Sequence, residues 1–159
     1  MKQLWAPWRI EYIQGEKDDR CIFCTASEKD SKDSLLLFKG SFSVVMLNKY
    51  PYNNGHVMIA PIRHVARIED VTAEEGSDIF RMISHATTVL TSLFKPDGFN
   101  IGMNVGKAAG AGIDDHLHMH VVPRWNGDVN FMPALADVKV MPEHLGATFE
   151  KLKPFFERF

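Results

Sequence analysis

The chain has 159 residues, the usual length of one domain with a full hydrophobic core. Its formal net charge is only -2, which argues against double-stranded nucleic acid and against a membrane surface as partners. No apolar run is long enough to span a membrane and the first residues lack the apolar core of a signal peptide, so we expect a cytoplasmic protein.

The first 20 residues are rich in aromatic side chains. Trp5, Trp8 and Tyr12 lie close together in this segment, and Pro7 separates the two tryptophans. So apolar a segment is expected to pack over the core or at a dimer seam rather than to extend as a free tail. We therefore treat residues 1–159 as one domain, with the segment 1–20 packing on it.

Two cysteines follow, Cys21 and Cys24, separated by two residues. This spacing lets both thiolates reach one metal ion, and it is typical of half of a tetrahedral zinc site. Two buried free thiols and a redox pair are the alternatives. A structural disulfide is not expected in the cytoplasm. A zinc site needs two more ligands, and histidines are the available candidates.

The next segments predict an antiparallel meander. Residues 35–38 and 42–48 indicate two strands joined by a short turn at 39–41. The Pro, Asn and Gly content of residues 50–55 indicates a loop, and residues 56–61 give a third strand that ends at Pro61.

A long helix is predicted from Thr72, which forms a capping box with Glu75. Its apolar positions recur at three and four residues, and they are Ile79, Ile83, Ala86, Leu90 and Leu93. The run Lys95-Pro96-Asp97-Gly98 ends the helix. Residues 99–104 indicate another strand, and residues 105–113 form a loop rich in glycine and alanine.

The C-terminal part predicts a turn at 126–128, a strand beginning at 131–133 and a helix after Pro142. The helix presents Leu145, Phe149, Leu152 and Phe156 on one face, and Pro154 should kink it or end it early. The predicted fold class is α+β: an antiparallel sheet meander with one long central helix and a C-terminal helix, both on one side of the sheet.

The segment of greatest functional interest carries His116, His118 and His120 at alternate positions. In a strand these three side chains share one face, while Leu117, Met119 and Val121 face the core. Three histidines on one face can hold a metal ion or carry out phosphoryl transfer. The glycine-rich loop before them lets backbone N–H groups approach an anion, which favours phosphoryl or nucleotidyl chemistry.

The run His-Leu-His-Met-His-Val-Val at 116–122 resembles the signature of the histidine triad (HIT) family. The segment Gly55–Pro61 followed by His64 resembles the strand that enters the site in that family. The segments 4–9 and 123–131 resemble its bacterial branch related to diadenosine tetraphosphate phosphorylases. The resemblance covers most of the chain, from about Cys21 to Arg124.

The resemblance implies a role for each matching residue. His118 would attack the α-phosphorus of a nucleotide, and His120 would hydrogen-bond the phosphate or the leaving oxygen. His56, Asn104, Gly112 and Ile113 would surround the phosphate, Asn48 would bond the ribose, and Met46 and Leu47 would lie near the base. Structural zinc would be held by Cys21, Cys24, His64 and His116, and the protein would be a homodimer.

The resemblance also implies the reaction: nucleotidyl transfer or hydrolysis on adenine nucleotides or dinucleoside polyphosphates through a nucleotidyl-histidine intermediate. Many relatives carry a glutamine four residues before the first histidine of the triad, where this chain has Gly112. The molecule that accepts the nucleotidyl group from the histidine intermediate can therefore be water or inorganic phosphate. Alternative functions are a nucleoside phosphoramidate hydrolase, a nucleotide sensor without catalysis, and a metalloenzyme that uses the triad itself as ligands.

Overall fold

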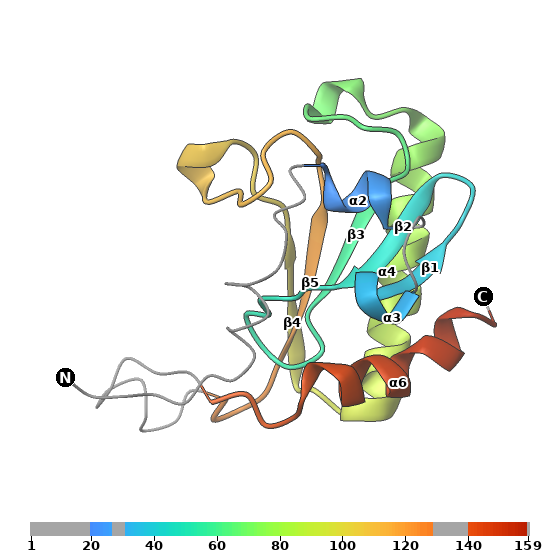
Figure 1. Ribbon diagram of the computed structural model, residues 1–159. Helices are drawn as coiled ribbons and strands as arrows, with labels where there is room; N and C mark the ends of the chain where they lie inside the picture. The colour runs from blue at the N-terminus through green and yellow to red at the C-terminus, as the bar shows by residue number, and fades with distance from the viewer. Residues whose placement is uncertain (1–19, 27–30, 129–139, 159) are drawn as a thin grey trace.

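The computed structural model describes residues 20–26, 31–128 and 140–158 (Figure 1). The predicted packing of the N-terminal aromatic segment and the predicted strand at 131–133 lie outside these residues. None of the helices in the described part combines the length and the apolar character needed to span a bilayer.

Five antiparallel strands form one sheet in the order β1-β2-β3-β5-β4. Their bounds are β1 Leu36–Lys39, β2 Ser43–Leu47, β3 Val57–Pro61, β4 Gly98–Gly102 and β5 Met119–Arg124. The predicted antiparallel meander is confirmed for β1, β2 and β3. The last strand of the described residues, β5, lies between β3 and β4, where it pairs with both.

The long helix α4, Ala73–Phe94, begins and ends as predicted. The Thr72 side chain accepts a hydrogen bond from the Glu75 amide, and the Glu75 carboxylate accepts one from the Thr72 amide. This reciprocal pair satisfies two N–H groups that the first turn of a helix leaves unbonded. Lys95 adopts the left-handed conformation (φ 48°) and ends the helix before Pro96.

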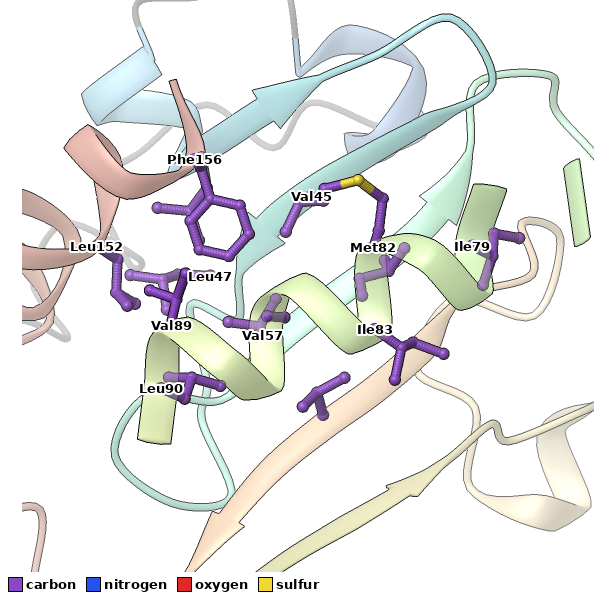
Figure 2. Packing of buried hydrophobic residues seen from close by; sticks show 14 of the residues in the cluster. Val45, Leu47, Val57, Ile79, Met82, Ile83, Val89, Leu90, Leu152 and Phe156 are labelled. Carbon is purple, nitrogen blue, oxygen red and sulfur yellow. The ribbon is translucent and has the colours of Figure 1, made fainter. Parts of the chain in front are cut away.

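Both long helices cover the same face of the sheet, as predicted. Val45 and Leu47 of β2 and Val57 and Ile59 of β3 face α4, because every second residue of a strand shares one face. Figure 2 shows the side chains of α4 meeting those of the strands, with Leu152 and Phe156 of helix α6 at its Val89 end.

Helix α6, Leu145–Phe156, contains all four predicted apolar positions and differs from the prediction at its start. It is capped by His144 rather than started by Pro142, and it continues through Pro154 instead of ending there. Only one turn follows the proline, so few hydrogen bonds are lost. Phe156 beyond it is fully buried in the core, and its burial of about 2 kcal/mol offsets that loss.

Among the described residues, the short helix α2, Ile22–Thr25, covers part of the opposite face of the sheet. Phe23 and Ala26 pack there against Met46, Met58 and Ala60. The sequence did not predict α2, nor the other short helices α3 (Ser31–Ser34), η1 (Ile68–Asp70) and η2 (Lys107–Ala109), because none spans enough residues to show a helical period. The helices therefore do not all lie on one side.

Candidate active site and metal centre

The histidine-bearing segment is only partly a strand, which corrects the prediction. Strand β5 begins at Met119, so His116, Leu117 and His118 precede it. The Leu117 amide donates to the Val65 carbonyl oxygen (2.6 Å) rather than to a neighbouring strand. The side chains still alternate: Met119 and Val121 pack with the α4 core, whereas His116 and His118 face Phe23 of α2.

His118 is 5% exposed, and the orientation of its ring is fixed by one hydrogen bond. Its Nδ1 lies 2.8 Å from the backbone carbonyl oxygen of His116. A carbonyl oxygen can only accept, so Nδ1 carries the proton and Nε2 keeps its lone pair. Within the described residues no hydrogen bond occupies that Nε2 atom. His118 therefore presents a nucleophilic nitrogen.

His120 has the opposite arrangement. The Tyr52 amide donates to His56 Nδ1 (3.1 Å), so the neutral His56 ring carries its proton on Nε2. That Nε2–H points at His120 Nδ1, 2.9 Å away, which must then accept. His120 therefore carries its own proton on Nε2 and can donate it to an oxygen of a bound phosphate.

Burial and the neighbouring His118 lower the pKa of His120 to about 4. Burial is the larger cause, because a charged imidazolium loses hydration in the site. His120 is therefore neutral at pH 7. It acts there as a hydrogen-bond donor and adds no positive charge beside the nucleophile.

This lowered pKa predicts a pH dependence of stability. Between pH 6.5 and 4 the unfolded chain binds a proton at His120 that the folded chain excludes. The stability that depends on neutral His120 should therefore be fully present above pH 6.5. The free energy of unfolding should fall by about 3 kcal/mol as the pH drops to 4. Urea denaturation at a series of pH values measures this loss.

The matched control is His120→Gln, which keeps a buried hydrogen-bonding side chain but cannot titrate. Both proteins retain the Cys21 and Cys24 region, so subtracting their curves removes any common effect of acid on it. Parallel curves for the two proteins between pH 6.5 and 4 would contradict the assignment of the lowered pKa to His120.

A second cluster of side chains shares His116 with the triad. Cys21, Cys24, His64 and His116 each direct one potential ligand atom to a common point, and these atoms all lie within 4.8 Å of one another. Cys21 Sγ is 3.1 Å and Cys24 Sγ is 3.6 Å from His116 Nδ1, and Cys24 Sγ is 3.2 Å from His64 Nδ1. Ligand atoms around a tetrahedral zinc are separated by about 3.3–3.8 Å, so this cluster has the right size.

The donor chemistry fits zinc as well. His116 Nε2 lies 2.9 Å from the Pro61 carbonyl oxygen, so Nε2 holds the proton and Nδ1 offers its lone pair to the cluster. Metal-binding histidines characteristically donate their second N–H in this way. His116 is fully buried, and burial lowers its pKa, which favours the neutral form that binds metal.

The three triad histidines do not converge on one point. Their Nδ1 atoms face a cysteine (His116), a backbone carbonyl (His118) and His56 (His120). In the described parts of the chain, the cluster with the two cysteines is the one suited to a metal. The geometry disfavours the alternative in which the triad itself holds the ion.

The other residues expected near a nucleotide divide into two groups. The Met46 and Ile113 side chains lie on the same face as Phe23, in or against its cluster. The Leu47 side chain does not, because it is buried in the α4 core, so only its backbone can line the site. Its place near the base stays a prediction.

Three further candidates lie in loops. Asn48 directly follows β2, and its side chain accepts a hydrogen bond from the Tyr50 amide (2.8 Å). Asn104 follows β4, two residues after Gly102, which is paired with His120. Gly112 is exposed, in the loop before the triad.

Two contacts of the site were not predicted from the sequence. The Phe23 ring lies 5.1 Å from the ring of His116 and 5.0 Å from that of His118, between centroids. Tyr52 stacks on His56 at 4.8 Å. The place of Phe23 between two candidate ligands was a usable signal, but no feature of the sequence marked Tyr52.

Comparisons with known proteins agree with this geometry. The model of the HIT domain family matches residues 29–127. A Mycobacterium tuberculosis protein named AP-4-A phosphorylase is 35% identical over 157 residues, covering 93% of this chain and 80% of its own. A Dictyostelium discoideum protein named bis(5'-adenosyl)-triphosphatase is 32% identical over 93 residues, covering 58% and 62%.

A solved structure from Mycobacterium smegmatis, described as a Zn-bound histidine triad family protein, superposes with a TM-score of 0.67. It is 23% identical and covers 87% of this chain and 94% of its own. At this identity the likeness shows the shared fold, and the fold class predicted from the sequence is confirmed.

Proposed function

Because this chain belongs to the HIT domain family, we propose that it cleaves dinucleoside polyphosphates through a nucleotidyl intermediate on His118. The observation that carries the proposal is the unprotonated Nε2 of His118, fixed by the bond from Nδ1 to the His116 carbonyl. The relative that matches 93% of the chain is named a phosphorylase, so inorganic phosphate is the acceptor we favour.

In the first step the Nε2 lone pair of His118 forms a bond to the α-phosphorus. The bond from that phosphorus to the bridging oxygen breaks, and its electron pair leaves with the nucleoside polyphosphate. The His118 ring becomes cationic, so the bond from its Nδ1–H to the His116 carbonyl becomes charge-assisted and stronger. A neutral His120 avoids repelling this new charge.

In the second step an acceptor oxygen attacks the same phosphorus and the bond to Nε2 breaks, which restores His118. Phosphate as acceptor gives a nucleoside diphosphate, and water gives a monophosphate. Gly112 has no side chain to occupy the space beside the intermediate. An open position there supports a second anion as the acceptor.

Product analysis tests the acceptor. With diadenosine tetraphosphate and inorganic phosphate, ADP and ATP should form in equal amounts, because one phosphate oxygen replaces His118 on phosphorus. Without phosphate, turnover should fall strongly. Quantitative anion-exchange chromatography separates the nucleotides, and [18O]phosphate should place its label in ADP alone.

Sulfate at the same ionic strength is the control for salt effects. AMP and ATP formed at the same rate with or without phosphate would make the protein a hydrolase and contradict phosphorolysis. No product under either condition, although the nucleotide binds, would contradict the enzymatic function itself.

The Cys21, Cys24, His64 and His116 cluster is proposed to hold structural zinc. Two thiolates and two imidazoles complete a tetrahedron, which leaves no open position for a substrate. Zinc would hold α2 against the segment before β5. It would thereby fix Phe23 over His118 without touching the reacting phosphate.

The domain organisation, the oligomeric state and the location in the cell are also proposals. The whole chain, residues 1–159, is proposed to form a single HIT domain. A homodimer is supported by β4, which lies at the end of the sheet and whose Ile101 side chain is 45% exposed. A cytoplasmic location is supported by the two cysteines, which form no disulfide.

A further inference from the structure

The loop before β3, residues 50–55, holds His56 through a backbone group rather than a side chain. The Tyr52 amide donates to His56 Nδ1, and the His56 amide donates to the Asn53 carbonyl (3.2 Å). The turn that closes here needs Gly55, whose φ is 71° and whose Cβ, if present, would lie 3.1 Å from Leu90 Cδ2. The short loop thus places one N–H group opposite one ring nitrogen.

The position of this amide is fixed from the other side of the loop. Asn53, the next residue, is 4% exposed, and its side chain donates to the Pro123 carbonyl (3.0 Å) and to Asp128 (2.9 Å). Asp128 is in turn held by both Arg124 Nε (2.7 Å) and the Trp125 amide (3.3 Å). Strand β5 and the turn after it therefore anchor the Tyr52 amide.

A backbone amide differs from a side chain in one respect that matters here. It cannot release its proton near neutral pH and it cannot accept one, so it sets the direction of any hydrogen-bond chain that starts from it. From Tyr52 the chain runs to His56 Nδ1 and then from His56 Nε2 to His120 Nδ1. Reversing any one of these bonds would place two protons, or none, between the same pair of atoms.

We infer that Tyr52 is a positioning residue, whose backbone N–H fixes the tautomer of His56 and, through it, presents the Nε2–H of His120 to the phosphate. The inference rests on the proposed function only for the identity of that phosphate. Its structural claim, the tautomers of His56 and His120, concerns the protein without substrate.

The Tyr52 side chain has a role of its own, separate from that of the backbone amide. Its ring stacks on His56 at 4.8 Å with an interplanar angle of 29°, and its centroid is 5.6 Å from that of His120. His56 has no exposed surface, although the Tyr52 side chain that covers it is 51% exposed. The ring therefore keeps water from competing for the bond between the two histidines.

His118 and His120 thus have opposite tautomers, because a backbone acceptor fixes the one and a backbone donor fixes the other. A carbonyl, which only accepts, fixes His118 with a bare Nε2. An amide, which only donates, fixes His120 with a protonated Nε2 through His56. One ring supplies a lone pair and the other supplies a proton, although only one residue, Met119, separates them in the sequence.

The test is 15N NMR of the ring nitrogens in protein labelled at histidine, without substrate, at pH 7. In the wild type, His56 and His120 should each have a protonated Nε2 and an unprotonated Nδ1. With uniform labelling, a scalar coupling should cross the hydrogen bond between the Tyr52 amide nitrogen and His56 Nδ1. A protonated Nδ1 on His56 or His120, or a coupled pair that excludes Tyr52, would overturn the inference without any variant.

Two substitutions separate the amide from the ring. Tyr52→Pro removes the N–H, and His56 and His120 should then populate both tautomers, with kcat lowered about tenfold and KM nearly unchanged. Tyr52→Ala keeps the N–H, so the tautomers should remain fixed. Fixed tautomers in a folded Tyr52→Pro protein, or lost ones in Tyr52→Ala, would overturn the role of the amide.

The outcomes for this inference and for the proposed function are separable. Tautomers as expected in a protein that does not cleave dinucleoside polyphosphates would leave the positioning role intact and refute only the reaction. Turnover by a wild-type protein with the reversed His120 tautomer would refute only the positioning role.

Discussion

Replacing His118 by alanine is expected to lower turnover of a dinucleoside polyphosphate by roughly 10⁴-fold or more, because the nucleophile is removed. The fold should survive, since the sheet is closed by β5 residues that follow His118. The measurement is steady-state turnover, together with circular dichroism and a melting curve. Intact mass should show wild-type protein carrying one nucleoside monophosphate after rapid quenching, and His118→Ala carrying none.

A suitable control is His144→Asn, which keeps the capping bond at the start of α6 and lies outside the site. It should turn over at the wild-type rate. Retention of a tenth or more of the activity by His118→Ala, or a trapped nucleotide on another residue, would refute the nucleophilic role.

The second large effect is expected at the cysteine pair. Cys21→Ser with Cys24→Ser should lower bound zinc from one ion per chain to none, as measured by elemental analysis. Loss of a structural metal should reduce stability by on the order of 3 kcal/mol, or roughly 6–12 °C in melting temperature. The domain keeps its α4 core, so we expect it to remain folded at room temperature.

Ile22→Ser is the matched control, because it introduces the same side chain into the same helix at a position that is 41% exposed. It should keep the metal and lose less than about 0.5 kcal/mol. A cysteine double variant that still holds one zinc per chain would refute the proposed ligand set.

The sequence predicted the large elements well, because each carried a strong local signal. The capping box of Thr72 and Glu75 marked the start of α4, and the spacing of its apolar residues showed its length. Short apolar runs bounded by turn and loop residues located β2 and β3. The short helices α2 and α3 gave no such signal, since four residues complete hardly one turn.

The ends of β5 and α6 were harder to predict for a tertiary reason. The alternation of residues 116–120 is that of a strand, but the Leu117 amide bonds to Val65, a loop residue far away in the sequence. Helix α6 continues past Pro154 because Phe156 is buried among residues of other elements. Neither partner can be read from the local sequence.

The candidate site was predictable in its residue types and less so in its contacts. The spacing of Cys21 and Cys24 pointed to a metal, and the family resemblance supplied His64 and His116, which the structure places beside them. That these four residues hold zinc stays a prediction. The resemblance placed both Met46 and Leu47 near the base, but adjacent residues of a strand face opposite ways, so the Met46 side chain faces Phe23 and that of Leu47 faces α4.

The position of β5 in the sheet also has a consequence for how the protein is made. Of the strands in the described part of the chain, β5 leaves the ribosome last, yet Val121 pairs with both Val57 of β3 and Ile101 of β4. Until residues 119–124 emerge, β3 and β4 each have an open edge in the middle of the future sheet, a state prone to aggregation.

The same late strand directly follows His118 and contains His120. Insertion of β5, a pairing between residues more than 60 positions apart at Met58 and His120, is intrinsically slow compared with forming α4. The step that completes the sheet therefore also brings His118 into the site. A nascent chain therefore becomes competent for catalysis no earlier than the inner edges of β3 and β4 are covered.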